Sequence, residues 1–162
     1  MTQIADWTLT NTAAAIAARN VSALEVTEAA LTRIAMRQPT LNALVRIDAA
    51  GALAAAKAAD HALAAAQSAG PLHGVPLAHK DMFYRPGVPV TCGSSIRRNF
   101  EPDVLATVLA RLDAAGAITI GALNMSEFAN GPTGHNVHFG PTRNPGTRGT
   151  SPEARRADPG PR

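Results

Sequence analysis

The residue that could most clearly take part in a reaction is a lysine at the end of an apolar run. Lys80 directly follows Val75–His79 and precedes Asp81, and a loop rich in glycine and proline begins at Arg85. An isolated lysine in such a place is usually a surface cation. A lysine whose pKa is lowered by partial burial can instead accept a proton as a general base. The residue alone leaves both interpretations open.

The other polar side chains near this lysine form no metal or nucleophile pattern by themselves. Three histidines lack the spacing of metal ligands: His79, His135 and His138. Three hydroxyl residues occur in a turn, where such groups commonly bond to nearby backbone: Thr91, Ser94 and Ser95. The single cysteine excludes an intrachain disulfide and a cysteine-pair metal site.

The first half of the chain predicts helices around one short strand. Residues 22–25, Ser-Ala-Leu-Glu, have the spacing of a capping box, so a helix should begin there. Pro39 is expected to stop it. Residues 41–47 are short and rich in branched side chains, which favours a strand. Asp48 should then open a second helix that runs to about Ser68.

The second half predicts the elements that must position Lys80. Val75–His79 is a strand candidate, and Asp103 can cap a helix that runs through Ala115 and ends at Gly116. Ala117–Leu123 is a second strand. Strand, helix and strand in this order form a βαβ-type unit, so we predict an α/β fold with a parallel or mixed sheet and a helical N-terminal layer.

Charge and composition exclude several classes of function. The net charge of +3 resides in residues 143–162, which hold five arginines against two acidic residues, so no basic face for nucleic acid is expected in the body of the chain. No window approaches the roughly 18 apolar residues of a membrane span, and the N-terminus does not resemble a signal peptide. These features predict a cytoplasmic protein that binds neither nucleic acid nor membrane.

Taken together, the motifs are ordered like those of one known family. Residues 71–81 read Pro-Leu-His-Gly-Val-Pro-Leu-Ala-His-Lys-Asp, residues 91–94 read Thr-Cys-Gly-Ser, and residues 124–129 read Asn-Met-Ser-Glu-Phe-Ala. Residues 131–136 and 139–145 carry further Gly-Pro-Thr loops. This series, over about residues 5–145, resembles the N-terminal part of the amidase-signature family.

The resemblance implies hydrolysis of carbon–nitrogen bonds in a small-molecule amide. In that family a lysine, a bridging serine in a cis peptide and a nucleophilic serine form a proton relay. Lys80 matches the lysine, and Gly131, Pro132 and Thr133 match a loop near the substrate cleft. Asp81 is expected to be structural. The resemblance implies no metal and no organic cofactor, and it leaves a homo-oligomer open.

The sequence departs from the family after residue 145. Neither the family's Gly-Gly-Ser-Ser-Gly-Gly-Ser signature nor its later nucleophile turn occurs. Residues 146–162 hold no leucine, valine, isoleucine or aromatic residue, so we expect a disordered tail outside a family domain of residues 1–145. Suitable codons for this tail, shifted by one inserted base, encode the missing signature. We therefore hypothesise a frameshift, and a truncated, inactive chain.

Two alternatives to a simple amidase remain. One is a fragment related to the A subunit of a tRNA-dependent amidotransferase, which shares these motifs. His79 and Met82 on either side of Lys80-Asp81 depart from the pattern associated with that protein. The other alternative is a non-catalytic pseudogene product.

Overall fold

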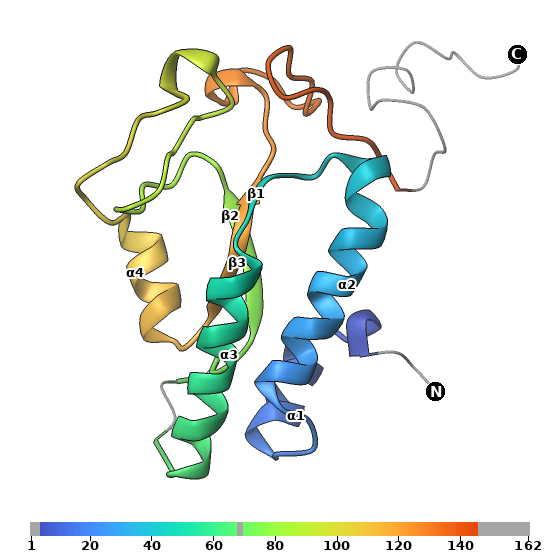
Figure 1. Ribbon diagram of the computed structural model, residues 1–162, viewed down its shortest axis with the longest axis vertical. Helices are drawn as coiled ribbons and strands as arrows, with labels where there is room; N and C mark the ends of the chain where they lie inside the picture. Colours follow the sequence, from blue (N-terminus) through green and yellow to red (C-terminus); the bar gives the residue numbers. More distant parts are fainter. Residues whose placement is uncertain (1–3, 68–69, 146–162) are drawn as a thin grey trace, which may run out of the picture. The chain divides into compact units, whose positions relative to one another are not determined.

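The computed structural model describes residues 4–67 and 70–145 (Figure 1). Its helices and strands occur in the order that follows. The elements are η1 (Ile4–Asp6), α1 (Leu9–Ala17), α2 (Ala23–Leu41), β1 (Leu44–Ile47), α3 (Ala49–Ala64), β2 (Pro76–Lys80), η2 (Ser95–Arg97), α4 (Thr107–Ala114), β3 (Ile118–Leu123) and η3 (Glu127–Ala129). The expected tail, residues 146–162, lies outside the described residues.

The three strands form one sheet in the order β1-β3-β2. The Ile118 amide donates to the Val75 carbonyl at 2.9 Å, and the Asp81 amide donates to the Leu123 carbonyl at 3.2 Å. Residue numbers therefore rise together along the two partners, so β2 and β3 run parallel. The helix α4 connects them, which confirms the predicted βαβ arrangement.

The strand β1 pairs with β3 in the opposite direction. The Asn124 amide donates to the Ala43 carbonyl at 2.8 Å, and the Asp48 amide donates to the Ile120 carbonyl at 3.0 Å. Here the residue numbers rise on one strand while they fall on the other, so β1 is antiparallel. The sheet is mixed, and the predicted α/β class is confirmed.

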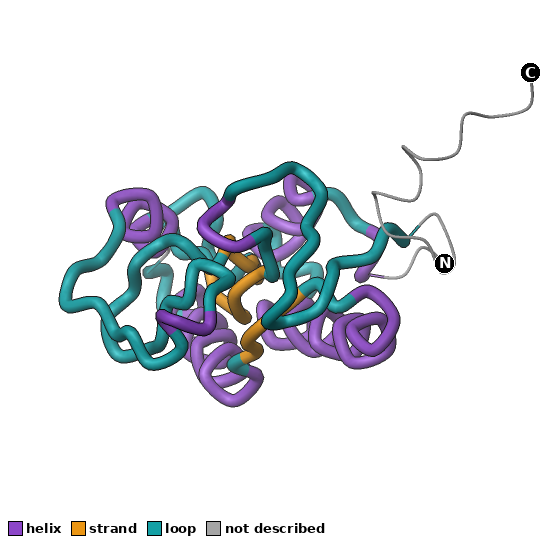
Figure 2. The backbone as a smooth tube through the Cα atoms, turned by 90° about the horizontal axis from the view of Figure 1, so that it is seen from above, coloured by secondary structure: helices purple, strands orange, loops and turns teal. Residues whose placement is uncertain are grey.

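The chain divides into two compact units. The helical unit holds the described residues up to Met36, together with Ile47–His79 and Ala106–Gly121. The loop unit holds Arg37–Arg46, Lys80–Leu105 and the described residues from Ala122 onward. Figure 2 shows how much of the chain is loop rather than helix or strand.

Small side chains build the core of the helical unit. Ala52 and Ala56 on α3 are fully buried against Ala23 at the start of α2 and against Ile118 and Ile120 on β3. Alanine at the contact lets a helix approach its neighbours closely, and the branched residues of β3 fill the space that remains. The alanine-rich composition thus serves helix-to-sheet packing.

Two of the three predicted helix starts are confirmed. The Glu25 amide donates to the Ser22 hydroxyl at 3.0 Å and the Glu25 carboxylate accepts from the Ser22 amide at 2.8 Å, which is a capping box. The Asp48 carboxylate accepts from the Gly51 amide at 2.9 Å and caps α3. The helix α1 was not predicted, and Thr8 caps it.

The expected stop at Pro39 is wrong, because α2 continues to Leu41. A proline removes one intrahelical hydrogen bond, and this loss matters little so close to the helix end. The Gln38 side chain provides new bonds there. Its carbonyl accepts from the amides of Ala43 and Leu44, each at 3.0 Å, so the turn after the helix is held by a side chain.

The predicted cap at Asp103 is also wrong. The helix α4 begins at Thr107, and its N-cap residue is Ala106, which makes no side-chain cap bond. Ala106 has an extended backbone that separates Asp103 from the first helical amides, so the exposed carboxylate does not cap them.

No helix of the described ranges 4–67 and 70–145 is long and apolar enough to cross a membrane.

Candidate active site

Lys80 is the last residue of β2 and is exposed. Its neighbour His79 is buried, as expected where successive side chains of a strand point to opposite faces. The described residues therefore do not bury Lys80. The lysine amine lies where a reacting molecule can reach it.

Asp81 fixes the chain immediately after this lysine. The residue is 1% exposed, and its carboxylate accepts hydrogen bonds from the Thr91 amide at 3.1 Å and from the Thr91 hydroxyl. The Cys92 amide donates to the Asp81 carbonyl at 2.9 Å. The Thr91 hydroxyl also accepts from the Gly93 amide at 3.0 Å. The turn at residues 91–94 is thus bound to the end of β2.

Asn136 binds three loop segments to one another. The residue is 2% exposed, and its side chain donates to the carbonyls of Gly93 and Met125, both at 2.7 Å. Its side-chain oxygen accepts from the amides of His138 at 2.8 Å and Phe139 at 2.9 Å. A Cβ atom on Gly93 would lie 2.8 Å from the Asn136 side-chain nitrogen, so this close approach requires glycine.

Glu127 lies between a serine and a histidine. The Ser94 hydroxyl donates to Glu127 Oε1 at 2.6 Å, and His138 Nε2 lies 3.0 Å from the same oxygen. The Ser94 bond, and then the His138 contact, lower the pKa of the Glu127 carboxyl. The Ser94 hydroxyl thus donates to the carboxylate and not to the imidazole. Ser94 is also fully buried, so this is not a nucleophile–base pair.

The predicted substrate loop follows Glu127 in the same unit. Gly131 and Pro132 are exposed and Thr133 is half-buried. The Gly131 amide donates to the Ala129 carbonyl at 3.0 Å, and the Thr133 hydroxyl accepts from the His135 amide at 3.3 Å. Lys80 and this loop both belong to the loop unit. The loop is accessible to a ligand.

Comparison with known proteins identifies the family. The amidase family model matches residues 25–152. The chain belongs to the amidase family. The A subunit of the glutamyl-tRNA(Gln) amidotransferase of Acidothermus cellulolyticus is 53% identical to it over 133 residues, which are 82% of this chain and 26% of that protein. The chain therefore spans about a quarter of the length of this curated relative.

Solved amidase structures share the fold. The peptide amidase of Stenotrophomonas maltophilia has a TM-score of 0.81 and 32% identity, over 89% of this chain and 31% of that chain. A bacterial aryl acylamidase of the amidase-signature enzymes has a TM-score of 0.86 and 26% identity, over 93% of this chain and 31% of that chain. The recognised family and the mixed-sheet fold are thus confirmed.

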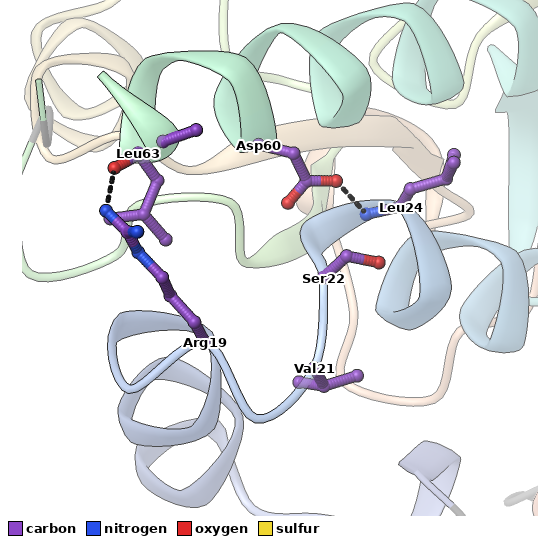
Figure 3. A pocket seen from close by; sticks show the side chains of 7 residues that line it. Arg19, Val21, Ser22, Leu24, Asp60 and Leu63 are labelled. Carbon is purple, nitrogen blue, oxygen red and sulfur yellow. Dashed lines mark hydrogen bonds between the residues drawn. The ribbon is translucent and has the colours of Figure 1, made fainter. Parts of the chain in front are cut away.

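The helical unit contains a pocket of about 300 Å³, which is separate from the candidate site residues in the loop unit (Figure 3). The Asp60 carboxylate accepts from the amides of Ala23 at 2.7 Å and Leu24 at 3.1 Å, so a residue of α3 caps α2. The Arg19 guanidinium donates to the Leu63 carbonyl at 2.6 Å near the end of α3. The polar groups that line the pocket complete helix ends, and we assign it a structural role.

Two residues that organise this region, Glu127 and Asn136, had no predicted role. Both lie within the motifs that carry the family resemblance. The signal for them was their residue type, since a carboxylate and a carboxamide among glycine-rich turns have many unpaired backbone groups and hydroxyls to bind.

Proposed function

We propose that this chain supplies the lysine of an amidase that hydrolyses carbon–nitrogen bonds of a small-molecule amide. The observation that carries the proposal is the place of Lys80, exposed at the end of β2 and followed by the buried Asp81. Membership of the amidase family supports it. In this mechanism the neutral Lys80 amine accepts a proton from a bridging serine, which in turn activates the nucleophilic serine.

The proposal requires burial of Lys80 that the described residues do not provide. A lysine amine becomes a base near neutral pH when burial disfavours its charged form. Bound substrate, or polypeptide outside the described residues, would have to supply that burial. Gly131, Pro132 and Thr133 are the residues of this chain that we propose to contact the substrate, because their loop is accessible in the same unit.

The family's serine-rich signature and nucleophile turn do not occur among the 162 residues, and we propose that these residues alone are inactive. The test is to express it beside a version in which one base is inserted after the Pro145 codon and the shifted frame is read onward. The first should hydrolyse benzamide no faster than buffer. The second should be active, and Lys80→Ala should reduce its rate by about 10²–10⁴-fold.

Two results would count against this assignment. Turnover by the chain as printed that survives Lys80→Ala would show that another group or a contaminant performs the chemistry. A gene whose shifted frame does not encode the serine signature would remove the frameshift explanation. Direct sequencing across the Pro145 codon decides the second point before any protein is made.

A second candidate is a role as the A subunit of an amidotransferase. Several relatives of that name are 45–53% identical to this chain, whereas the two amidase structures described above are 26–32% identical. A glutaminase assay of the frame-restored protein separates the two. Release of ammonia from glutamine only when the other amidotransferase components are added supports the second candidate, and hydrolysis of benzamide without them supports the amidase.

A further inference from the structure

One carboxylate oxygen in the loop unit receives two side chains from different segments. Glu127 Oε1 accepts from the Ser94 hydroxyl at 2.6 Å, and His138 Nε2 lies 3.0 Å away from it. Ser94 belongs to the turn that follows Thr91, and His138 belongs to the loop after residue 134. Hydrogen bonds to a charged group are stronger than those between neutral groups. Glu127 therefore links three segments that are far apart in sequence.

The backbone beside Glu127 adopts a conformation that side chains disfavour. Phe128 and Ala129 have φ of 49° and 59°, and Cys92 has φ of 52°. The Phe128 amide donates to the Cys92 carbonyl at 2.8 Å, so the left-handed positions of the two segments are directly bonded. Non-glycine residues keep left-handed backbone angles only where the surrounding structure holds them.

The bonds around Glu127 are what hold this turn. The Asn130 amide donates to the Glu127 carbonyl at 2.9 Å, and the Ala129 amide donates to the Ser126 carbonyl at 2.9 Å. Phe128 is exposed, so packing of its side chain adds little. The side-chain bonds of Glu127 to Ser94 and His138 thus act on the turn that leads directly into residues 131–133.

We propose that Glu127 is a positioning residue, which fixes the exposed Gly131–Thr133 loop in one conformation by tying the left-handed turn before it to Ser94 and His138. Its relevance to catalysis rests on the proposed function, in which this loop contacts the substrate. Glu127 takes no part in proton transfer in this account. The effect of Glu127 on the loop conformation can be measured in the 162-residue chain without any catalytic activity.

Hydrogen exchange of the full chain, followed by mass spectrometry, tests the proposal. Glu127→Ala should accelerate exchange of the amides of residues 128–131 by about tenfold or more, because it removes two bonds to a charged group. Amides of α3 in the helical unit should keep their exchange rates. Glu127→Gln should retain part of the protection, since its side-chain oxygen still accepts from Ser94. Glu101→Ala, at an exposed glutamate of the same unit, is the matched control and should change nothing.

The proposal is overturned if Glu127→Ala leaves residues 128–131 unchanged, or if it accelerates exchange equally in both units. If Glu127→Ala fails to fold, Glu127→Gln and Ser94→Ala are compared with the unmodified chain instead. Equal protection of the amides of residues 128–131 in all three proteins overturns the proposal. Absence of amidase activity in the frame-restored protein counts against the proposed function alone, because exchange is measured without substrate.

Discussion

The carboxylate of Asp81 accepts hydrogen bonds from both the backbone amide and the hydroxyl of Thr91. Asp81 is 1% exposed and immediately follows Lys80, so the cost of burying its carboxyl group is offset by two donors from one residue. This relationship joins the end of a strand to the turn that the family resemblance singled out. Asp81 therefore has a structural role next to Lys80, for which we propose a chemical role.

Replacement of Asp81 should destabilise the chain more than replacement of another aspartate. Asp81→Ala leaves the buried Thr91 amide and hydroxyl without this acceptor, and each unsatisfied buried group costs about 1–3 kcal/mol. Asp81→Asn keeps one acceptor and should cost less. Urea unfolding measures both. Asp103→Ala is the control, because the exposed Asp103 does not cap α4 and its loss should stay within about 0.5 kcal/mol. Equal midpoints for Asp81→Ala and Asp103→Ala would contradict the structural task.

Acid should weaken the fold through two carboxylates. The Ser22 amide and hydroxyl lower the pKa of Glu25, and Ser94 followed by His138 lowers that of Glu127. Both groups therefore bind fewer protons in the folded than in the unfolded chain. Their contribution is complete above the ordinary carboxyl pKa and is lost as the pH falls through the lower folded values. Urea midpoints should decrease between about pH 5 and pH 3. Glu127→Gln should flatten this decrease, and an unchanged slope would count against the Ser94 bond.

A left-handed residue after α3 offers a stabilising substitution. Ala66 has φ of 60°, and its amide donates to the Leu63 carbonyl at 3.1 Å. Glycine adopts this backbone without strain, so Ala66→Gly should stabilise the chain by about 1 kcal/mol. The same change at Ala58, which is exposed inside α3, should instead destabilise it by about 0.5–1 kcal/mol. Thermal unfolding of the two variants compares them directly, and a shift of the same sign in both would refute the argument.

The sequence predicted those parts of the fold that depend on local patterns. The Ser22–Glu25 capping box, the Asp48 cap and the strand before Lys80 all follow from residues close together in the chain. The stop predicted at Pro39 failed although the deciding residues are close in the chain, because a helix-stop pattern does not include a side-chain bond to the following turn. Pro39 is tolerated because the Gln38 side chain binds the turn after α2.

The candidate site was predictable to a similar degree. Lys80 and the Gly131–Thr133 loop were named from motifs, and these assignments stay predictions. The network around them joins residues separated by tens of positions, such as Ser94 with Glu127 and Asn136 with Gly93. No periodicity or spacing encodes such pairs, because the fold alone brings these turns together.

The thiol of Cys92 provides a chemical test of the turn next to Asp81. Burial raises the pKa of this thiol, while the nearby Arg97 guanidinium lowers it by a smaller amount. Only the thiolate reacts with iodoacetamide, so at pH 8 the folded chain should be alkylated more slowly than the same chain in urea. Arg97→Gln removes the opposing charge and should slow the reaction further, because the pKa then rises. Arg97 also packs over the Phe100 ring, with its Cζ atom 3.8 Å from the ring centroid. Phe100→Leu therefore serves as the control for lost packing alone. Faster alkylation of Arg97→Gln than of Phe100→Leu would show that exposure of the thiol, and not its charge environment, governs the rate.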